Sequence, residues 1–241
     1  MAGHSKWNNI KQRKGAQDAK RSKIFQKLSK EIYQAAKDGG ADEETNSSLR
    51  QAVETARAQN MPKDNIERAI KRATDSGDES NYENVLYEGY GKNGVAILVE
   101  GLTDNANRTS ANVKHAFSKN GGTMGGKGTV SYMFNSKGYF AISREDLDVD
   151  EDTMLLAALE AGAEDMESSD EAFEIYSEPH DFADVRDALK EAGYKFEQAQ
   201  LVQLPLNRIP VDEETADSIH GLIDMLEDDE DVSEVYHNAE L

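Results

Sequence analysis

Residues 139–201 read YFAISREDLDVDEDTMLLAALEAGAEDMESSDEAFEIYSEPHDFADVRDALKEAGYKFEQAQL. Their short apolar or alternating runs predict strands at 139–143, 164–167, 172–176 and 194–201. The longer amphipathic runs between them predict helices at 153–161 and 182–191. Strand, helix, strand, strand, helix, strand is the order of the ferredoxin-like fold. We therefore expect a ferredoxin-like βαββαβ domain over residues 136–206.

The sequence on either side of this segment also mixes strands and helices. Before it we expect strands at 82–90, 95–101 and 129–134 and a helix at 108–119; after it we expect a helix at 215–226 and a strand at 232–237. Because two elements are too few to form a domain, the end of the chain is expected to return to the earlier segment. A middle α/β domain would then consist of residues 81–135 and 207–241.

The first part of the chain has the period of helices. Apolar residues recur at helical spacing from Asp18 to the Gly39-Gly40 pair, again after Asn46, and again from Pro62. Together with the arm before them, these three helices predict a helical domain over residues 1–80. The expected fold class is α+β, with an N-terminal three-helix domain followed by two α/β domains, one ferredoxin-like and inserted in the other.

Charge is distributed unevenly along the chain. The 241 residues have a net charge of −20, which by itself argues against a polyanionic partner. Residues 1–72, however, contain 16 Lys and Arg against 9 Asp and Glu, whereas residues 73–241 have a net charge of −27. Such asymmetry within one chain indicates contact with nucleic acid or membrane by the basic part.

The basic residues of the first predicted helix recur at helical spacing. Lysines at 20, 23, 27, 30 and 37 form one stripe, roughly opposite the apolar face. A row of lysines suits the neutralisation of phosphates, although a solvated helix face has the same pattern. Trp7 lies in the basic arm. We expect its ring either to stack on a base or to pack the arm against the helical bundle. The residues expected to contact nucleic acid are Lys6, Trp7, Lys11, Arg13, Lys14, Lys20, Arg21, Lys23, Lys27, Lys30, Arg50, Lys63, Arg68, Lys71 and Arg72.

No motif predicts catalysis, a metal site or a cofactor. The chain has no cysteine, and its five histidines lack the spacing of metal ligands. Residues 121–128, GGTMGGKG, approach a phosphate-binding loop but end in Gly128, where a hydroxyl is required, although their N–H groups remain candidates for touching a phosphate. Residues 146–151 begin like a calcium loop but are interpreted as the acidic start of a helix. We expect no catalytic residue; a hydrolase using scattered carboxylates is the remaining enzyme alternative.

Several long blocks closely resemble the YebC/PmpR family. They include MAGHSKWNNIKQRK at 1–14, DAKR at 18–21, NMPKDNIERAIKR at 60–72, YEGYG at 87–91, GVAILVE at 94–100 and VSYMF at 130–134. The resemblance implies a helical N-terminal domain followed by two α/β domains, the middle one completed by the C-terminus. The sequence departs from the family pattern in two loops, at Glu43-Glu44 and at Lys92-Asn93.

The resemblance also implies a function. Family members are described as transcriptional regulators that bind DNA, and relatives including a mitochondrial translational activator act on translation instead. We therefore expect a non-enzymatic, DNA-binding regulator of gene expression. The alternative is a ribosome-associated translation factor that contacts ribosomal or messenger RNA through the same helices.

The expected partners are thus nucleic acid (DNA, or ribosomal or messenger RNA) and, in the alternative, the ribosome. No apolar run is long enough to span a membrane and the N-terminus has no signal-like segment, so we expect a cytoplasmic location without membrane contact. The sequence does not predict the oligomeric state.

Overall fold

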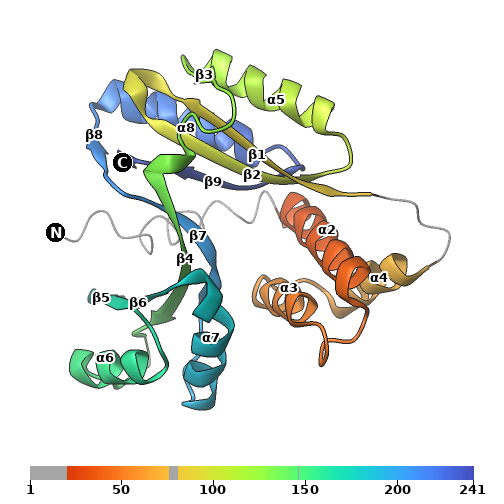
Figure 1. The fold of residues 1–241 in the computed structure, drawn as a ribbon, viewed down its shortest axis with the longest axis vertical. Helices are drawn as coiled ribbons and strands as arrows, with labels where there is room; N and C mark the ends of the chain where they lie inside the picture. The colour runs from red at the N-terminus through yellow and green to blue at the C-terminus, as the bar shows by residue number, and fades with distance from the viewer. Residues whose placement is uncertain (1–20, 76–80, 146) are drawn as a thin grey trace. The chain divides into compact units, whose positions relative to one another are not determined.

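The computed structural model describes residues 21–75, 81–145 and 147–241 (Figure 1). Two compact units are present: one is Phe134–Leu206, and the other joins the described residues up to Met133 with Asn207–Leu241. In the described ranges, every helix is too short or too polar to cross a lipid bilayer.

Three helices pack together at the start of the described chain: α2 (Arg21–Gly39), α3 (Ser47–Ala58) and α4 (Lys63–Thr74). Their apolar faces meet in one core that includes Ile32, Val53 and Ile66. Asn46 begins α3 by accepting a hydrogen bond from the Leu49 N–H at 3.0 Å. The three predicted helices are confirmed over these ranges.

The same unit contains a four-stranded antiparallel sheet in the order β3-β1-β2-β9. Its elements are β1 (Glu83–Tyr90), β2 (Ala96–Thr103), α5 (Ala106–Lys119), β3 (Thr123–Met124), α8 (Glu213–Glu227) and β9 (Val232–His237). Helices α5 and α8 cover one face of the sheet, where Phe117 and Leu222 share a core with Val99 (Figure 1). Strand β9 pairs with β2, with Val99 opposite Val235, so the end of the chain completes a sheet begun over 130 residues earlier. Strands β8 (Ile209–Pro210) and β10 (Ala239–Glu240) form a further short parallel pair within this C-terminal segment.

The unit Phe134–Leu206 has the predicted ferredoxin-like topology. Its elements in chain order are β4 (Phe134–Ser143), α6 (Glu151–Glu160), β5 (Asp165–Ser168), β6 (Ala172–Ser177), α7 (Phe182–Glu191) and β7 (Gln198–Pro205). The strands form an antiparallel sheet in the order β5-β6-β4-β7, and both helices pack on one face of it through Met154 and Val185. The α+β fold class, with one ferredoxin-like unit inserted in the other α/β unit, is therefore confirmed.

Three predicted strands, at 129–134, 139–143 and 194–201, were wrongly bounded. Residues 134–143 form the single strand β4 rather than the ends of two strands at 129–134 and 139–143, and β7 begins at Gln198 rather than 194. The first half of β4 pairs with the second half of β7, with Asn135 opposite Leu204. Meanwhile Tyr194 and Phe196 pack on the core before the strand begins. The polar turn-like residues 135–138 are thus held in the sheet by a partner that lies far along the chain.

The boundaries predicted for the separate domains remain predictions. The helices α2–α4 and the β3-β1-β2-β9 sheet belong to one compact unit. Contacts between the helices and this sheet, described next, are what join them.

Candidate nucleic-acid interface

The lysines of α2 do not form one open stripe. Lys23, Lys27 and Lys30 contact the acidic segment Glu227–Asp231 between α8 and β9, whereas Lys37 is exposed and donates a hydrogen bond to Oδ1 of Asn81 at 2.9 Å. Lys27 Nζ donates a hydrogen bond to the Glu227 carbonyl at 2.6 Å. Lys23 Nζ donates to the Asp228 carbonyl at 3.2 Å and lies 3.5 Å from its carboxylate. With Lys30, described next, these lysines fix three successive turns of α2 to one acidic loop of the same chain.

Lys30 reaches the most buried acid of that segment. Its Nζ lies 2.7 Å from Oδ1 of Asp231, whose side chain has no solvent exposure. The other oxygen of Asp231 accepts hydrogen bonds from Arg108, on α5, and from the hydroxyl of Thr109 at 2.9 Å. Burial acts to raise the pKa of Asp231, but the hydrogen bonds from Lys30, Arg108 and Thr109 outweigh it and hold the pKa below its usual value. Asp231 therefore joins α2, α5 and the loop before β9.

A second acid, the partly buried Glu31, lies one turn from Lys27. Burial, together with repulsion from Glu234 on β9, raises the pKa of Glu31 to about 7, although Lys27 opposes the shift. Burial also lowers the pKa of Lys27, against the attraction of Glu227, Glu234 and two further acids of the loop. The contact between α2 and β9 therefore contains a carboxyl group that titrates near neutral pH.

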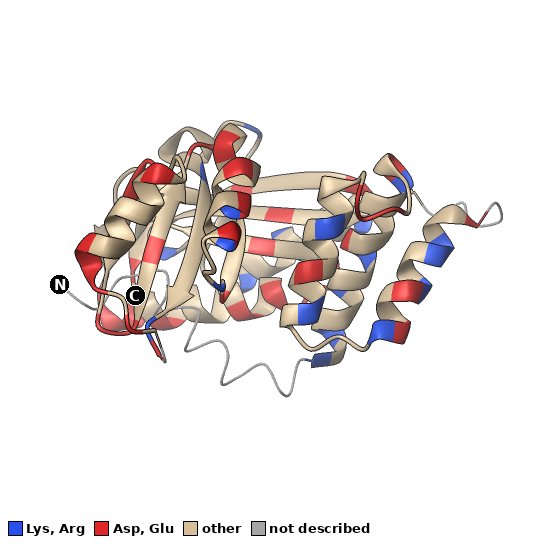
Figure 2. Ribbon diagram, turned by 90° about the horizontal axis from the view of Figure 1, so that it is seen from below, with Lys and Arg blue, Asp and Glu red and all other residues tan. Residues whose placement is uncertain are grey.

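The remaining predicted cations of the described helices are more open to solvent. Arg21, Lys63, Arg68, Lys71 and Arg72 are exposed and Arg50 is partly exposed. Lys63 forms an exposed ion pair with Glu67 at 3.3 Å, a type of contact that contributes little to stability. Figure 2 shows Lys and Arg along α2–α4, whereas Asp and Glu are the more frequent charges on α6, α7 and α8. We call these six cations, four of which lie on α4, the α4 basic face, and all six keep solvent-exposed surface.

The structure thus separates the predicted contact residues into groups. Lys23, Lys27 and Lys30 are engaged within the chain, and the α4 basic face is open. A third group lies outside the described residues: Lys6, Trp7, Lys11, Arg13, Lys14 and Lys20. That any of these residues contacts nucleic acid remains a prediction.

The glycine-rich loop already contains an anion. The buried carboxylate of Glu88, on β1, accepts hydrogen bonds from the N–H groups of Gly128, Val130 and Ser131 at 2.7–2.8 Å. Although burial favours the neutral acid, these bonds lower the pKa of Glu88. Of these three residues only Gly128 belongs to the loop 121–128, and there the expectation that the N–H group is offered to a phosphate is wrong, because Glu88 accepts its hydrogen bond.

The other acidic motif begins a helix. Asp150 accepts a hydrogen bond from the Thr153 N–H at 2.8 Å at the start of α6, while Asp146 lies outside the described residues. Within the described ranges, no group of His, Asp and Glu side chains is arranged to hold a metal ion.

Sequence reasoning missed the roles of Asp231, Glu31 and Glu88. One signal was present for Asp231: the acidic run at 227–231 and the lysine stripe are complementary in charge and similar in length. No comparable signal marked Glu31 or Glu88, because each is a single acid in an ordinary amphipathic or alternating pattern.

Comparison with known proteins agrees with this architecture over nearly the whole chain. The model of the TACO1/YebC N-terminal domain matches residues 5–76, and that of the TACO1/YebC second and third domains matches residues 82–239. The chain belongs to the TACO1/YebC family. A TACO1/YebC relative from Lacticaseibacillus casei, named a probable transcriptional regulatory protein, is 61% identical, with 98% of this chain and 97% of the relative covered.

Other TACO1/YebC relatives are similar at lower identity. A protein of Geobacillus kaustophilus with the same description is 55% identical, with 100% of this chain and 98% of that protein covered. The crystal structure of a conserved hypothetical protein from Aquifex aeolicus has a TM-score of 0.83 at 42% identity, covering 92% of this chain and 91% of that one.

Replacing Asp231 tests its role in joining the elements around it. Asp231→Asn leaves Lys30 and Arg108 without their buried counter-charge, so we expect a loss of about 3 kcal/mol or more in the free energy of unfolding at pH 7. Urea denaturation followed by circular dichroism measures this change. Asp228→Asn, at an exposed position of the same loop, should lower the free energy of unfolding by less than about 1 kcal/mol. Equal losses of stability in the two variants would contradict the role of Asp231 in joining these elements.

Glu31 should make stability depend on pH near neutrality. Because its pKa is raised to about 7 in the folded chain, the folded state binds a proton there that the unfolded state binds only near pH 4.5. The contribution of Glu31 to stability therefore increases as pH falls from 8 to 6. We expect Glu31→Gln to be more stable than the wild type at pH 8 and to show a smaller change in melting temperature between pH 8 and pH 6. The same pH dependence in both proteins would contradict this.

Proposed function

We propose that this chain is a non-enzymatic, nucleic-acid-binding regulator of gene expression that acts on DNA in the cytoplasm. The observation that carries the proposal is the α4 basic face, an exposed group of Lys and Arg in a chain of net charge −20. Relatives named probable transcriptional regulatory proteins support the same class of function.

The chemistry of the α4 basic face suits phosphates. Lys and Arg on an exposed helical surface neutralise phosphates and position a duplex without reading its sequence. The acidic remainder of the chain repels a polyanion, so it favours approach to the helices. The contact with Glu227–Asp231 also limits which lysines can reach nucleic acid. A phosphate that binds Lys23, Lys27 or Lys30 has to displace this segment.

One observation favours the second candidate, a translation factor that binds ribosomal or messenger RNA. The exposed cations come from three helices, with Arg21 on α2, Arg50 on α3 and the others on α4. A distributed set of this kind suits the shape of structured RNA, whereas a single helix entering the major groove is the usual reader of DNA sequence.

The α4 basic face is tested by removing charge without touching the core. The variant Lys63→Gln/Arg68→Gln/Lys71→Gln should bind a 24-base-pair DNA duplex at least about tenfold more weakly than the wild type in fluorescence anisotropy at 100 mM salt. The slope of log affinity against log salt should become shallower by about two to three. A structured RNA hairpin of equal charge, measured alongside, identifies the second candidate if it binds more tightly than the duplex.

A matched control separates a local effect from a change in net charge. Lys114, Lys119 and Lys195 are exposed on other elements, so the corresponding Gln triple variant removes the same charge elsewhere. If both triple variants weaken DNA binding equally, the loss comes from the change in net charge and not from the α4 basic face. No binding of either nucleic acid by the wild type would refute the proposal.

A further inference from the structure

A groove of about 450 Å³ lies beside the α4 basic face, between α2 and α4 and next to Tyr82. Its volume falls in the range of about 300–1,000 Å³ that small-molecule sites occupy. Three aromatic side chains line it, Phe25, Tyr33 and Tyr82, together with the three cations Lys30, Arg68 and Arg72 and one acid, Glu230. Aromatic surface and positive charge are therefore combined in one concavity.

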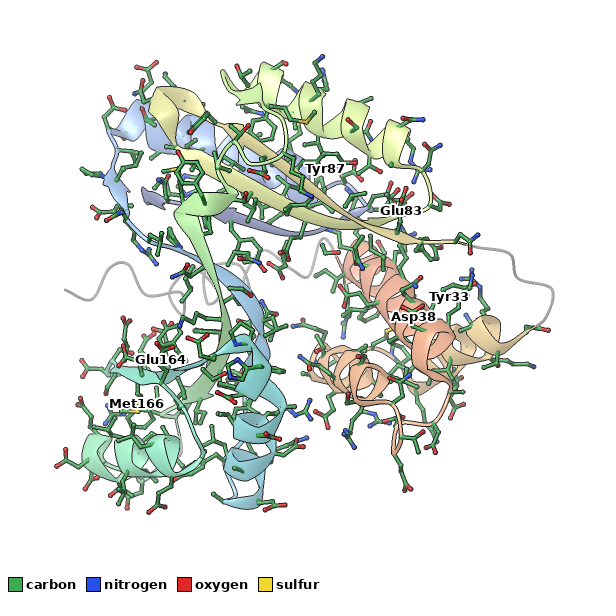
Figure 3. The ribbon with its side chains drawn as sticks, viewed as in Figure 1. Tyr33, Asp38, Glu83, Tyr87, Glu164 and Met166 are labelled. Carbon is green, nitrogen blue, oxygen red and sulfur yellow. The ribbon has the colours of Figure 1, made fainter. Side chains whose placement is uncertain are left out.

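The aromatic side chains are held in place by their neighbours. Tyr33, labelled on α2 in Figure 3, is almost fully buried and meets the Tyr82 ring edge-on at a centroid distance of 5.5 Å. The Arg72 guanidinium lies 5.3 Å from the Tyr33 ring, and Lys30 Nζ lies 5.8 Å from the Tyr82 ring. Phe25 and Tyr82 both keep part of their surface exposed. They offer a preformed surface to a flat ligand, since little side-chain entropy remains to be lost.

Three polar side chains of the groove, those of Gln26, Asn65 and Arg68, can contact a ligand. Arg68 is exposed and forms no ion pair with any described residue. The side-chain amides of Gln26 and Asn65, which also line the groove, have no hydrogen-bond partner in the described ranges. Asn65, Arg68 and Arg72 follow one another at positions i, i+3 and i+7, so they share one side of α4.

A nucleotide matches this combination of groups. Aromatic rings stack on a base of any sequence, amides hydrogen-bond to base edges, and guanidinium groups bind phosphate. A free phosphate would use the cations alone and leave the aromatic surface and the amides without a role. A base inside a duplex presents no face for stacking, so the ligand has to be unstacked.

We propose that this groove binds one unstacked nucleotide of a single-stranded segment, with the base on Phe25 and Tyr82 and the phosphate on Arg68 and Arg72. Gln26 and Asn65 contact the edge of the base. This inference rests on the proposed function and extends it, because the α4 basic face alone explains only contacts to phosphates.

The test compares single strands and duplexes on the full chain. Fluorescence anisotropy is measured with a 12-nucleotide RNA of mixed sequence, the DNA strand of the same sequence, and the 12-base-pair DNA duplex. Phe25→Leu and Tyr82→Leu keep apolar volume and charge while removing the ring, so each should weaken single-strand binding by about fivefold or more. Binding of the duplex should stay within twofold of the wild type.

Two further variants keep the test decisive. Asn65→Ala changes a partly exposed residue of α4 and should weaken single-strand binding by about threefold to tenfold without affecting the fold. Tyr132→Leu removes an exposed ring elsewhere in the chain and should change nothing. If the groove variants weaken binding of the RNA alone, the proposal is supported and RNA is the source of the nucleotide. If they weaken binding of both single strands, the proposal is supported and the groove accepts a nucleotide from either.

Other results would overturn it. If the groove variants weaken duplex and single strand equally, or weaken neither, the groove does not bind a base, and the proposed function stands on the α4 basic face alone. If the wild type binds none of the three nucleic acids, both proposals fail.

Discussion

A buried carboxylate has to be compensated, and the way this chain compensates Asp231 determines which of its cations remain on the surface. Lys30, Arg108 and Thr109 converge on Asp231 from α2 and α5, while Lys23 and Lys27 contact carbonyls of the same loop. Breaking such a site by removing one partner is costly, because the other charge then stays buried without a counter-charge. Lys23, Lys27 and Lys30 of α2 are therefore structural side chains in this state, and the cations of the α4 basic face remain open to solvent.

Local periodicity was enough to predict the helices and the order of elements in the ferredoxin-like unit, but it missed the two-residue strands β3, β8 and β10. The apolar residues of α2, α3 and α4 recur at the spacing of a buried helix face, and the strand–helix order of residues 136–206 allows few topologies. Errors arose where a distant partner overrides the local pattern, as at residues 135–138, which pair with β7. The site was predicted less well for the same reason. Which lysines are open depends on a loop 200 residues away, and the partners of Glu88 and Glu31 depend on folding as well.

The charge asymmetry of the chain thus has two consequences. Within the fold, part of the basic segment neutralises the acidic loop Glu227–Asp231, so a count of lysines overestimates the surface available to a polyanion. Beside that contact, the α4 basic face and the adjacent groove combine exposed cations with aromatic rings. Phosphate contacts position a nucleic acid, whereas stacking selects unpaired bases. A protein with both features is suited to nucleic acid that contains single-stranded segments beside structured ones.

The reactivity of individual lysines tests most directly whether the two groups of cations have these separate roles. Brief amine acetylation of the native chain, followed by peptide mass spectrometry, measures the exposure of each Nζ with and without bound nucleic acid. We expect Lys27 and Lys30 to react slowly in both states, and Lys63 and Lys71 to react quickly in the free protein and slowly in the complex. Fast reaction of Lys27 and Lys30 in the free protein, with protection only in the complex, would show that nucleic acid, rather than the acidic loop, is their partner.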